Sequence, residues 1–330
     1  MNTLMNYSTG AYQYKTGLQM LGDANQGNVF YVRPRTGSDG QDGRSPATAF
    51  KTLKAALGAC TANQNDVVYL MAESNTAANT TDYQATVLDW SKDGVHLIGV
   101  NAGGMVGQRA RISNLSTATA IVGGLVTLTA NNCYIANIEI FQGQGGTNPS
   151  GASIALLVSG QRNVIENCQI SGIGHLELDD ATSCSLSISG SENMFKHCYI
   201  GLDTVLRTTA TAEVRITDGT RNTFEDCIIN SYTATTTFKS IIYTVGSAHT
   251  ISIFKNCMLV AEQNRTSTVA PTGAVLTAAN TAGNILFHGC GIYGYVDYST
   301  ITDAKILILS YAGLATHATL PGIAAGQQTT

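Results

Sequence analysis

Four side chains capable of acid–base chemistry fall within six positions of the sequence: His175, Glu177, Asp179 and Asp180. Carboxyl groups placed in pairs act as general acid and base in the cleavage of glycosidic bonds. A cluster of aspartates beside a basic residue could instead hold a Ca²⁺ ion for a lyase reaction. These four residues are therefore the candidate catalytic residues if the protein is an enzyme.

Further charged residues follow in the next part of the chain, namely Asp203 with Arg207, and Asp218 with Arg215 or Arg221. If the chain repeats at this spacing, they could stack with the first group into an acidic groove. Only 12% of all residues are charged, and charged residues collect in solvated loops without any catalytic role. The pattern therefore favours loop charges over a catalytic site.

Composition excludes several other classes of site. The formal net charge is −4, so the chain lacks the basic field that attracts nucleic acid or an anionic membrane. The first twenty residues have no long apolar stretch and no basic start, which predicts neither a secretory signal nor a transmembrane segment. The eight cysteines show no C-x-x-C spacing, so we expect no metal, cofactor or disulfide framework.

Five of these cysteines instead mark an internal repeat. Cys168, Cys198, Cys227, Cys257 and Cys290 follow one another at steps of 30, 29, 30 and 33 residues, in segments such as RNVIENCQISG and RNTFEDCIINS. An earlier copy, CYIANIEIFQG, fits if Ile138 takes the place of the cysteine. A fixed period of this length is typical of solenoid proteins.

Each copy predicts a strand, a one-residue bend and a second strand. The positions three before and two after the cysteine are apolar in all six copies, but odd and even offsets cannot face the same side of one strand. The bend falls on the residue just before the cysteine, which belongs to types that tolerate the left-handed conformation. These bend residues are Asn137, Asn167, His197, Asp226, Asn256 and Gly289.

A third apolar strand precedes each copy, in segments such as IALLVSG and EVRITDG. Three strands in about 30 residues cannot bury a core alone, so the coils must stack. The sequence therefore predicts an all-β, right-handed parallel β-helix. Its interior should contain a ladder of like residues rather than a redox or metal site: Ile138, Cys168, Cys198, Cys227, Cys257 and Cys290, with Phe195, Phe224, Phe254 and Phe287.

The two ends of the chain differ from the repeats. Ser45-Pro46 predicts a helix near residues 46–59 whose Phe50, Leu53, Ala56 and Leu57 would cover the open end of the solenoid. We expect three parts: an N-terminal arm (1–28) for assembly or anchoring, the capped β-helix (29–300), and a C-terminal strand and tail (301–330). We expect both terminal segments to dock on neighbouring subunits in an assembly; the alternative is that they fold back on their own shaft.

Three segments carry a resemblance to a known group: GSDGQDGRSPATAFKTLKAAL, the strand NDVVYL, and DGVHLIG followed by N-x-x-x-x-C-x-I coils. Over roughly residues 29–300 the chain resembles the pectate-lyase-like parallel β-helix superfamily, especially members found in bacteriophage virions and tail spikes. The polygalacturonase-type members have a paired-Asp coil, a G-H-G coil and an R-I-K coil. Here only the Asp179–Asp180 pair is present.

The resemblance implies a non-enzymatic structural protein of a bacteriophage particle, either capsid-decorating or resembling a tail fibre or tail spike. Its expected location is the virion, and its expected partners are further copies of itself and other capsid or tail proteins. A trimer is expected from the resemblance alone. The alternatives are a tail-spike depolymerase, acting as a polysaccharide lyase or glycoside hydrolase on host-surface glycans, and a non-catalytic glycan-binding adhesin. The single tryptophan, Trp90, lies before the regular coils and gives glycan binding little support.

Overall fold

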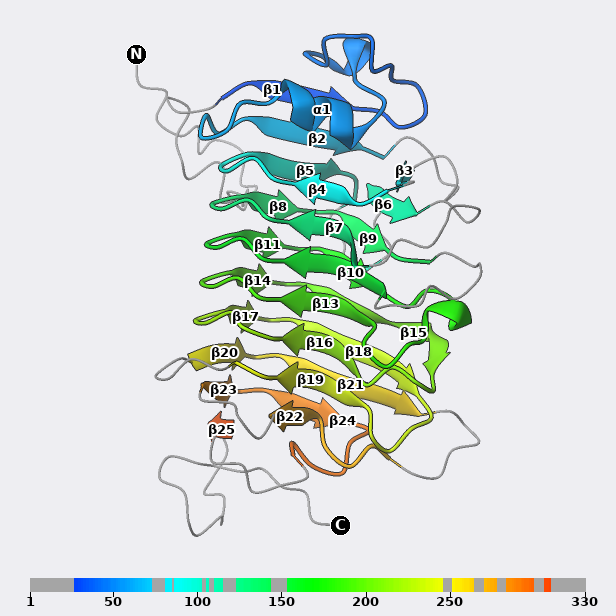
Figure 1. Cartoon of the computed structure of the whole chain (residues 1–330), viewed down its shortest axis with the longest axis vertical. Helices are drawn as coiled ribbons and strands as arrows, with labels where there is room; N and C mark the ends of the chain where they lie inside the picture. Colours follow the sequence, from blue (N-terminus) through cyan, green and yellow to red (C-terminus); the bar gives the residue numbers. More distant parts are fainter. Residues whose placement is uncertain are drawn as a thin grey trace, which may run out of the picture.

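The chain forms one stack of coils in the computed structural model, which describes residues 27–72, 81–84, 86–102, 105–106, 110–114, 123–143, 153–245, 251–263, 270–277, 283–299 and 306–309. The coils lie one above another along the long axis, and their strands form three sheets (Figure 1). All strand pairs that the structure describes are parallel, for example β10 with β13 and β11 with β14.

Sheet A is the ten-stranded sheet. In spatial order its strands are β1 (Val29–Val32), β2 (Val67–Met71), β5 (His96–Val100), β8 (Tyr134–Ala136), β11 (Val164–Glu166), β14 (Met194–Lys196), β17 (Thr223–Glu225), β20 (Ile251–Lys255), β23 (Asn284–His288) and β25 (Ile306–Leu309).

Sheets B and C complete the coils. Sheet B contains β3 (Thr81–Gln84), β6 (Arg111–Asn114), β9 (Glu139–Phe141), β12 (Gln169–Ser171), β15 (Tyr199–Arg207), β18 (Ile228–Thr233), β21 (Met258–Gln263) and β24 (Gly291–Tyr293). Sheet C contains β4 (Leu88–Trp90), β7 (Gly123–Leu128), β10 (Ser153–Val158), β13 (Cys184–Ile188), β16 (Ala212–Ile216), β19 (Lys239–Tyr243) and β22 (Val275–Thr277).

The predicted one-residue bends connect sheet A to sheet B. All six bend residues have positive φ, between 49° and 65°, which turns the chain while apolar residues on both sides face the interior. Several bend residues also bond to the coil beside them: Asn167 Nδ2 donates to Asn137 Oδ1 at 2.7 Å, and Asn256 Nδ2 donates to Asp226 Oδ1 at 3.2 Å. The bend prediction is therefore confirmed.

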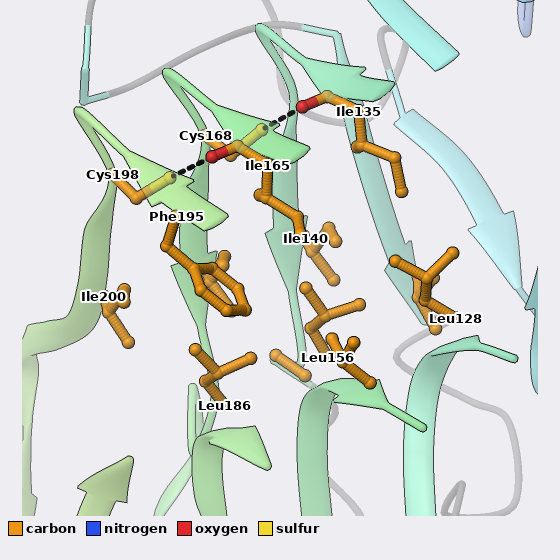
Figure 2. Close-up of a cluster of buried hydrophobic side chains, with 14 of the residues drawn as sticks. Leu128, Ile135, Ile140, Leu156, Ile165, Cys168, Leu186, Phe195, Cys198 and Ile200 are labelled. Atoms are coloured by element: carbon orange, nitrogen blue, oxygen red, sulfur yellow. Dashed lines mark hydrogen bonds between the residues drawn. The ribbon is translucent and has the colours of Figure 1, made fainter. Parts of the chain in front are cut away.

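The interior contains the predicted ladder (Figure 2). Phe195, Phe224, Phe254 and Phe287 stack with ring centroids 4.7, 4.2 and 5.1 Å apart. Each ladder cysteine donates its thiol to a carbonyl of the preceding coil, as Cys198 Sγ does to Ile165 O at 3.4 Å. Burial raises the pKa of the Cys198 thiol well above its ordinary value, so this thiol stays protonated. The ladder thus packs the core and satisfies backbone carbonyls.

A second ladder lies at the turns from sheet C to sheet A, here called the C–A edge (residues 159–163, 189–193 and 217–222). Asn163, Asn193 and Asn222 are buried in successive coils. Each side chain accepts from a backbone N–H of the coil before it and donates to a carbonyl there; Asn193 bonds Asn163 N and Gly160 O, both at 3.0 Å. Glycines precede them, because a Cβ at Gly190 would collide with the Gly160 carbonyl.

The N-terminal cap differs from its prediction. Ser45 caps only a short 3-10 helix, η3 (Pro46–Thr48), and the chain then extends before the α-helix α1 (Leu53–Ala59) begins at its own N-cap, Thr52. The carboxylate of Asp39 separates the two, since it accepts from Lys51 N at 2.8 Å and Thr52 N at 2.9 Å. A capping helix is therefore present near 46–59, but the α-helix begins at Leu53 and not at Pro46; Phe50, Leu53, Ala56 and Leu57 all join the core.

The fold is a right-handed parallel β-helix of about six regular turns with roughly 30 residues per coil, as predicted. None of the described helices is long and apolar enough to cross a membrane. Most of the expected N-terminal arm (residues 1–26) and C-terminal tail (310–330) lies outside the described residues, so their expected docking on neighbours stays a prediction.

Candidate functional site

The candidate residues His175 to Asp180 lie in the connection from sheet B to sheet C, here called the B–C edge (residues 172–183, 208–211 and 234–238). Glu177 lies in a 3-10 helix, η5 (Leu176–Leu178), with His175 just before it and Asp179 and Asp180 just after it. This helix projects from the side of the shaft (Figure 1). His175 and Glu177 are exposed, and His175 Nδ1 accepts from Glu177 N at 3.2 Å. Leu178 is buried and fixes the loop by packing with Ile173 and Ala210.

Asp179 is a buried structural carboxylate. Its Oδ2 accepts from Thr208 N at 2.7 Å, Thr208 Oγ1 at 2.8 Å and Thr209 N at 2.9 Å, while Oδ1 accepts from Ala210 N at 2.8 Å. The donors all belong to the loop of the next coil. A carboxylate whose oxygens are occupied in this way cannot take a proton from a substrate without breaking the contact between two loops.

Asp180 closes a local turn. Its Oδ1 accepts from Thr182 N at 3.0 Å and Thr182 Oγ1 at 2.8 Å. These bonds lower the pKa of Asp180 below its ordinary value, with a smaller contribution from Arg215. A carboxylate with a lowered pKa is a weak base near neutral pH, because the best general bases have a pKa close to the working pH.

Arg207 does not pair with Asp203 as the acidic-groove hypothesis required. It is fully buried, its Nε lies 3.0 Å from Glu213 Oε1, and its NH1 and NH2 groups donate to backbone carbonyls, including Ile173 O at 3.2 Å. Burial raises the pKa of Glu213, while Arg207 and the hydroxyl of Ser185 act in the opposite direction. This buried ion pair anchors the end of β15 inside the B–C edge.

The remaining charges of the hypothetical groove lie elsewhere. Asp218 is exposed in a turn of the C–A edge, and Arg221 in the same turn has its NH2 2.5 Å from Glu192 Oε1. Arg215 NH2 donates to Ala181 O at 2.6 Å. The structure therefore distributes these residues over two different edges of the coil, and they do not form the single acidic groove that the sequence left open.

A polar row on the outer face of sheet B escaped the sequence reasoning. Arg111, Glu139, Gln169 and Tyr199 are aligned by strand register, and Arg111 Nε lies 2.6 Å from Glu139 Oε2. Further along the face, Asn230 Nδ2 donates to the Tyr199 hydroxyl at 2.6 Å and to Glu262 Oε1 at 3.0 Å. The sequence could have predicted this row. Glu139, Gln169 and Tyr199 each directly follow a ladder residue that faces the interior, so they must point outward.

The carboxylates described above are engaged in contacts within the protein. The described residues contain no group of three or more His, Cys, Asp or Glu side chains placed to hold a metal ion. The carboxylate of Glu139 is paired and only 3% exposed, and that of Asp179 is occupied by four donors. On the outer face of sheet B, Gln169 and Asn230 are also only 5% exposed, so the half-buried Tyr199 and Arg111 are its more accessible polar groups.

No protein-family model and no curated protein matches the chain. Solved structures do. A pectin methylesterase variant in complex with a hexasaccharide is 15% identical, with a TM-score of 0.59 over 92% of this chain and 94% of that one. Pectin methylesterase PemA from Erwinia chrysanthemi is 13% identical, with a TM-score of 0.56 over 88% and 91%. The pectate lyase Pel9A is 12% identical, with a TM-score of 0.52 over 91% and 79%.

These neighbours establish the fold that the chain shares with carbohydrate-active enzymes. At identities of 12–15% they do not transfer an active site, because the same solenoid supports unrelated activities. The resemblance to the pectate-lyase-like superfamily is confirmed at the level of the fold, while its bacteriophage branch stays a prediction.

Proposed function

We propose that the chain is a non-enzymatic structural component of a virus particle in which the β-helix acts as a rigid shaft. The observation that carries this proposal is the use of the acidic candidates: Asp179 clips two loops together and Asp180 closes a turn. Continuous phenylalanine, cysteine and asparagine ladders give the shaft the stiffness of a spacer. The motif resemblance to virion proteins supports the location.

The location is tested on purified particles from the source. Mass spectrometry of density-banded particles should find the chain at a fixed ratio to the major capsid or tail protein, and electron microscopy should resolve it as a regular appendage. Recovery only from the soluble fraction, with none in banded particles, would overturn the proposal.

The absence of catalysis is tested separately with the full chain. Incubation with pectin, polygalacturonate and host-surface polysaccharide should release neither methanol nor new sugar ends. Cleavage that is abolished by Glu177→Gln or Asp180→Asn, but not by Lys196→Ala on sheet A, would place the protein among the glycan-cleaving β-helices instead.

A second candidate function is non-catalytic glycan binding on the outer face of sheet B. The polar row from Arg111 to Tyr199 favours it, as does the fold shared with a protein solved in complex with a hexasaccharide. A glycan array probed with the full chain should then show a ligand whose binding is lost in Arg111→Ala and kept in Lys196→Ala. Equal binding by both variants, or no ligand at all, would exclude this surface.

A further inference from the structure

The outer face of sheet A carries an apolar patch at its N-terminal end. Val67 on β2, Ile98 on β5, and Tyr134 and Ala136 on β8 alternate with the core residues of their strands and form a cluster separate from the shaft interior. They are only 1%, 7%, 6% and 1% exposed, although they point away from the core. We call these four residues the outer patch.

The same face is open further along the shaft. Beginning with β11, the outward positions of successive strands are half-exposed, and most of them become polar or charged, as in Glu166, Lys196, Thr223 and Glu225. These half-exposed positions show that neighbouring strands alone do not bury an outward-facing side chain. The 1% exposure of Val67 and Ala136 therefore needs another cause. The outer patch must therefore have a cover.

The outer patch lies at the starts of its strands, and this position indicates which segment of the chain can reach it. Val67 and Tyr134 are the first residues of their strands, and at the opposite end of β5 Val100 is 40% exposed. The chain enters the β-helix at the patch side, where Gly27 N donates to Asn65 O at 3.2 Å and Val29 pairs with Val67. The segment preceding β1 therefore joins the described chain on the side of the sheet where the patch lies.

That segment has the composition and the length needed. Residues 11–26, AYQYKTGLQMLGDANQ, contain only Lys15 and Asp23 as charges among several aromatic and aliphatic side chains. Three strand spacings separate β1 from β8, roughly 15 Å, which about five extended residues can span. Sixteen residues are more than enough to cross the patch.

We propose that residues 11–26 fold back over the outer face of their own sheet A and cover the outer patch. This inference does not depend on the proposed function. His96, which is 3% exposed between Val67 and Ile98, fits beneath such a cover. Its Nδ1 accepts from Tyr134 N at 3.0 Å, and burial lowers its pKa to about 4, so the imidazole is neutral there.

Photo-cross-linking of the full chain tests the proposal. The photoreactive residue p-benzoylphenylalanine replaces Tyr69, which is half-buried beside the patch and similar in size, and in a matched control it replaces Met194, which faces outward on β14. Equal amounts of isotopically light and heavy chains are mixed before irradiation, and the linked peptides are identified by mass spectrometry.

The expected result is a cross-link from position 69 to residues 11–26 with both peptides of the same isotope, and no such link from position 194. Links that join light and heavy peptides would show that the arm of another copy covers the patch. Links from position 69 to other segments, or equal linking to 11–26 from both positions, would also overturn the proposal. The double variant Leu18→Asp/Leu21→Asp should lose the link, whereas Leu4→Asp should keep it.

Discussion

At the C–A edge three successive coils turn around an asparagine in the same position, whereas at the B–C edge neighbouring coils use different residues. Asn163, Asn193 and Asn222 bond the backbone of the coil before them at 2.8–3.0 Å. On the B–C edge, Asp179 bonds the next loop in one coil, and Arg207 with Glu213 occupies the interior of the following one.

The difference follows from loop length. Turns of nearly constant length place the same backbone groups above one another, so one residue type can satisfy them all. Loops of different lengths leave buried backbone N–H and C=O groups that have no equivalent in the neighbouring coil. A charged side chain can form hydrogen bonds with several such groups within one coil. A charged cluster on the irregular edge of a solenoid is therefore first a structural feature.

The largest expected effect comes from breaking the buried ion pair between Arg207 and Glu213 at the B–C edge. Arg207→Met leaves Glu213 buried without its counter-charge, which typically costs about 3–5 kcal/mol in the free energy of unfolding. The denaturant midpoint, followed by circular dichroism, should fall accordingly.

The double variant Arg207→Met/Glu213→Gln is the matched control. Because it removes both charges, it should recover much of the stability lost in the single variant. If Arg207→Met alone left the denaturant midpoint unchanged, the stability of the B–C edge would not depend on the ion pair between Arg207 and Glu213.

A smaller effect is expected on the regular edge. Asn193→Ala leaves Asn163 N–H and Gly160 C=O without partners inside the shaft, and unsatisfied buried groups cost about 1–3 kcal/mol. The neighbouring Glu192→Ala removes only solvent-exposed ion pairs, worth about 0–1 kcal/mol. Equal midpoints for the two variants would mean that the asparagine ladder is not needed for stability.

The regular parts of the coil were predictable because a local rule repeats in them. The residue before each ladder cysteine had to bend the chain, and its identity in six copies pointed to positive φ, which all six show. The buried asparagines stood in the same segments, as in RNVIENC and ENMFKHC, but a single polar residue beside a turn does not reveal whether it faces water or the core.

The B–C edge was not predictable for a physical reason. The partners of Asp179 lie about one coil later in a loop of different length, so no periodicity links them. Arg207 was expected on the surface because charged residues are seldom buried, and only the length of β15 carries it inside to Glu213. At the cap, Ser45 begins a helix as expected, but it is the short η3; Asp39, from the loop before η3, accepts from Thr52 N, where α1 has its own N-cap.

Asp179→Asn should weaken the contact between the two B–C loops. The amide offers one acceptor oxygen in place of two, and its NH₂ would face backbone donors, so we expect a loss of about 1–2 kcal/mol. Because the contact is local, limited proteolysis is the sharper measurement: cleavage within residues 202–211 should rise, while cleavage at the C–A edge should not. Unchanged cleavage of that loop would mean that it is held by other contacts.

The smallest expected effect concerns Asp180 and depends on pH. Its pKa is lowered in the folded chain by the bonds from Thr182, so its stabilising contribution is present above the unfolded value of about 3.9 and is lost as the pH falls through the folded pKa. Since Asp180 lies near the surface, the contribution should be below about 1 kcal/mol. The midpoint difference between the wild type and Asp180→Asn should therefore be measurable near neutral pH and vanish in acid. A difference that is independent of pH would show that the charge of this carboxylate does not hold the turn.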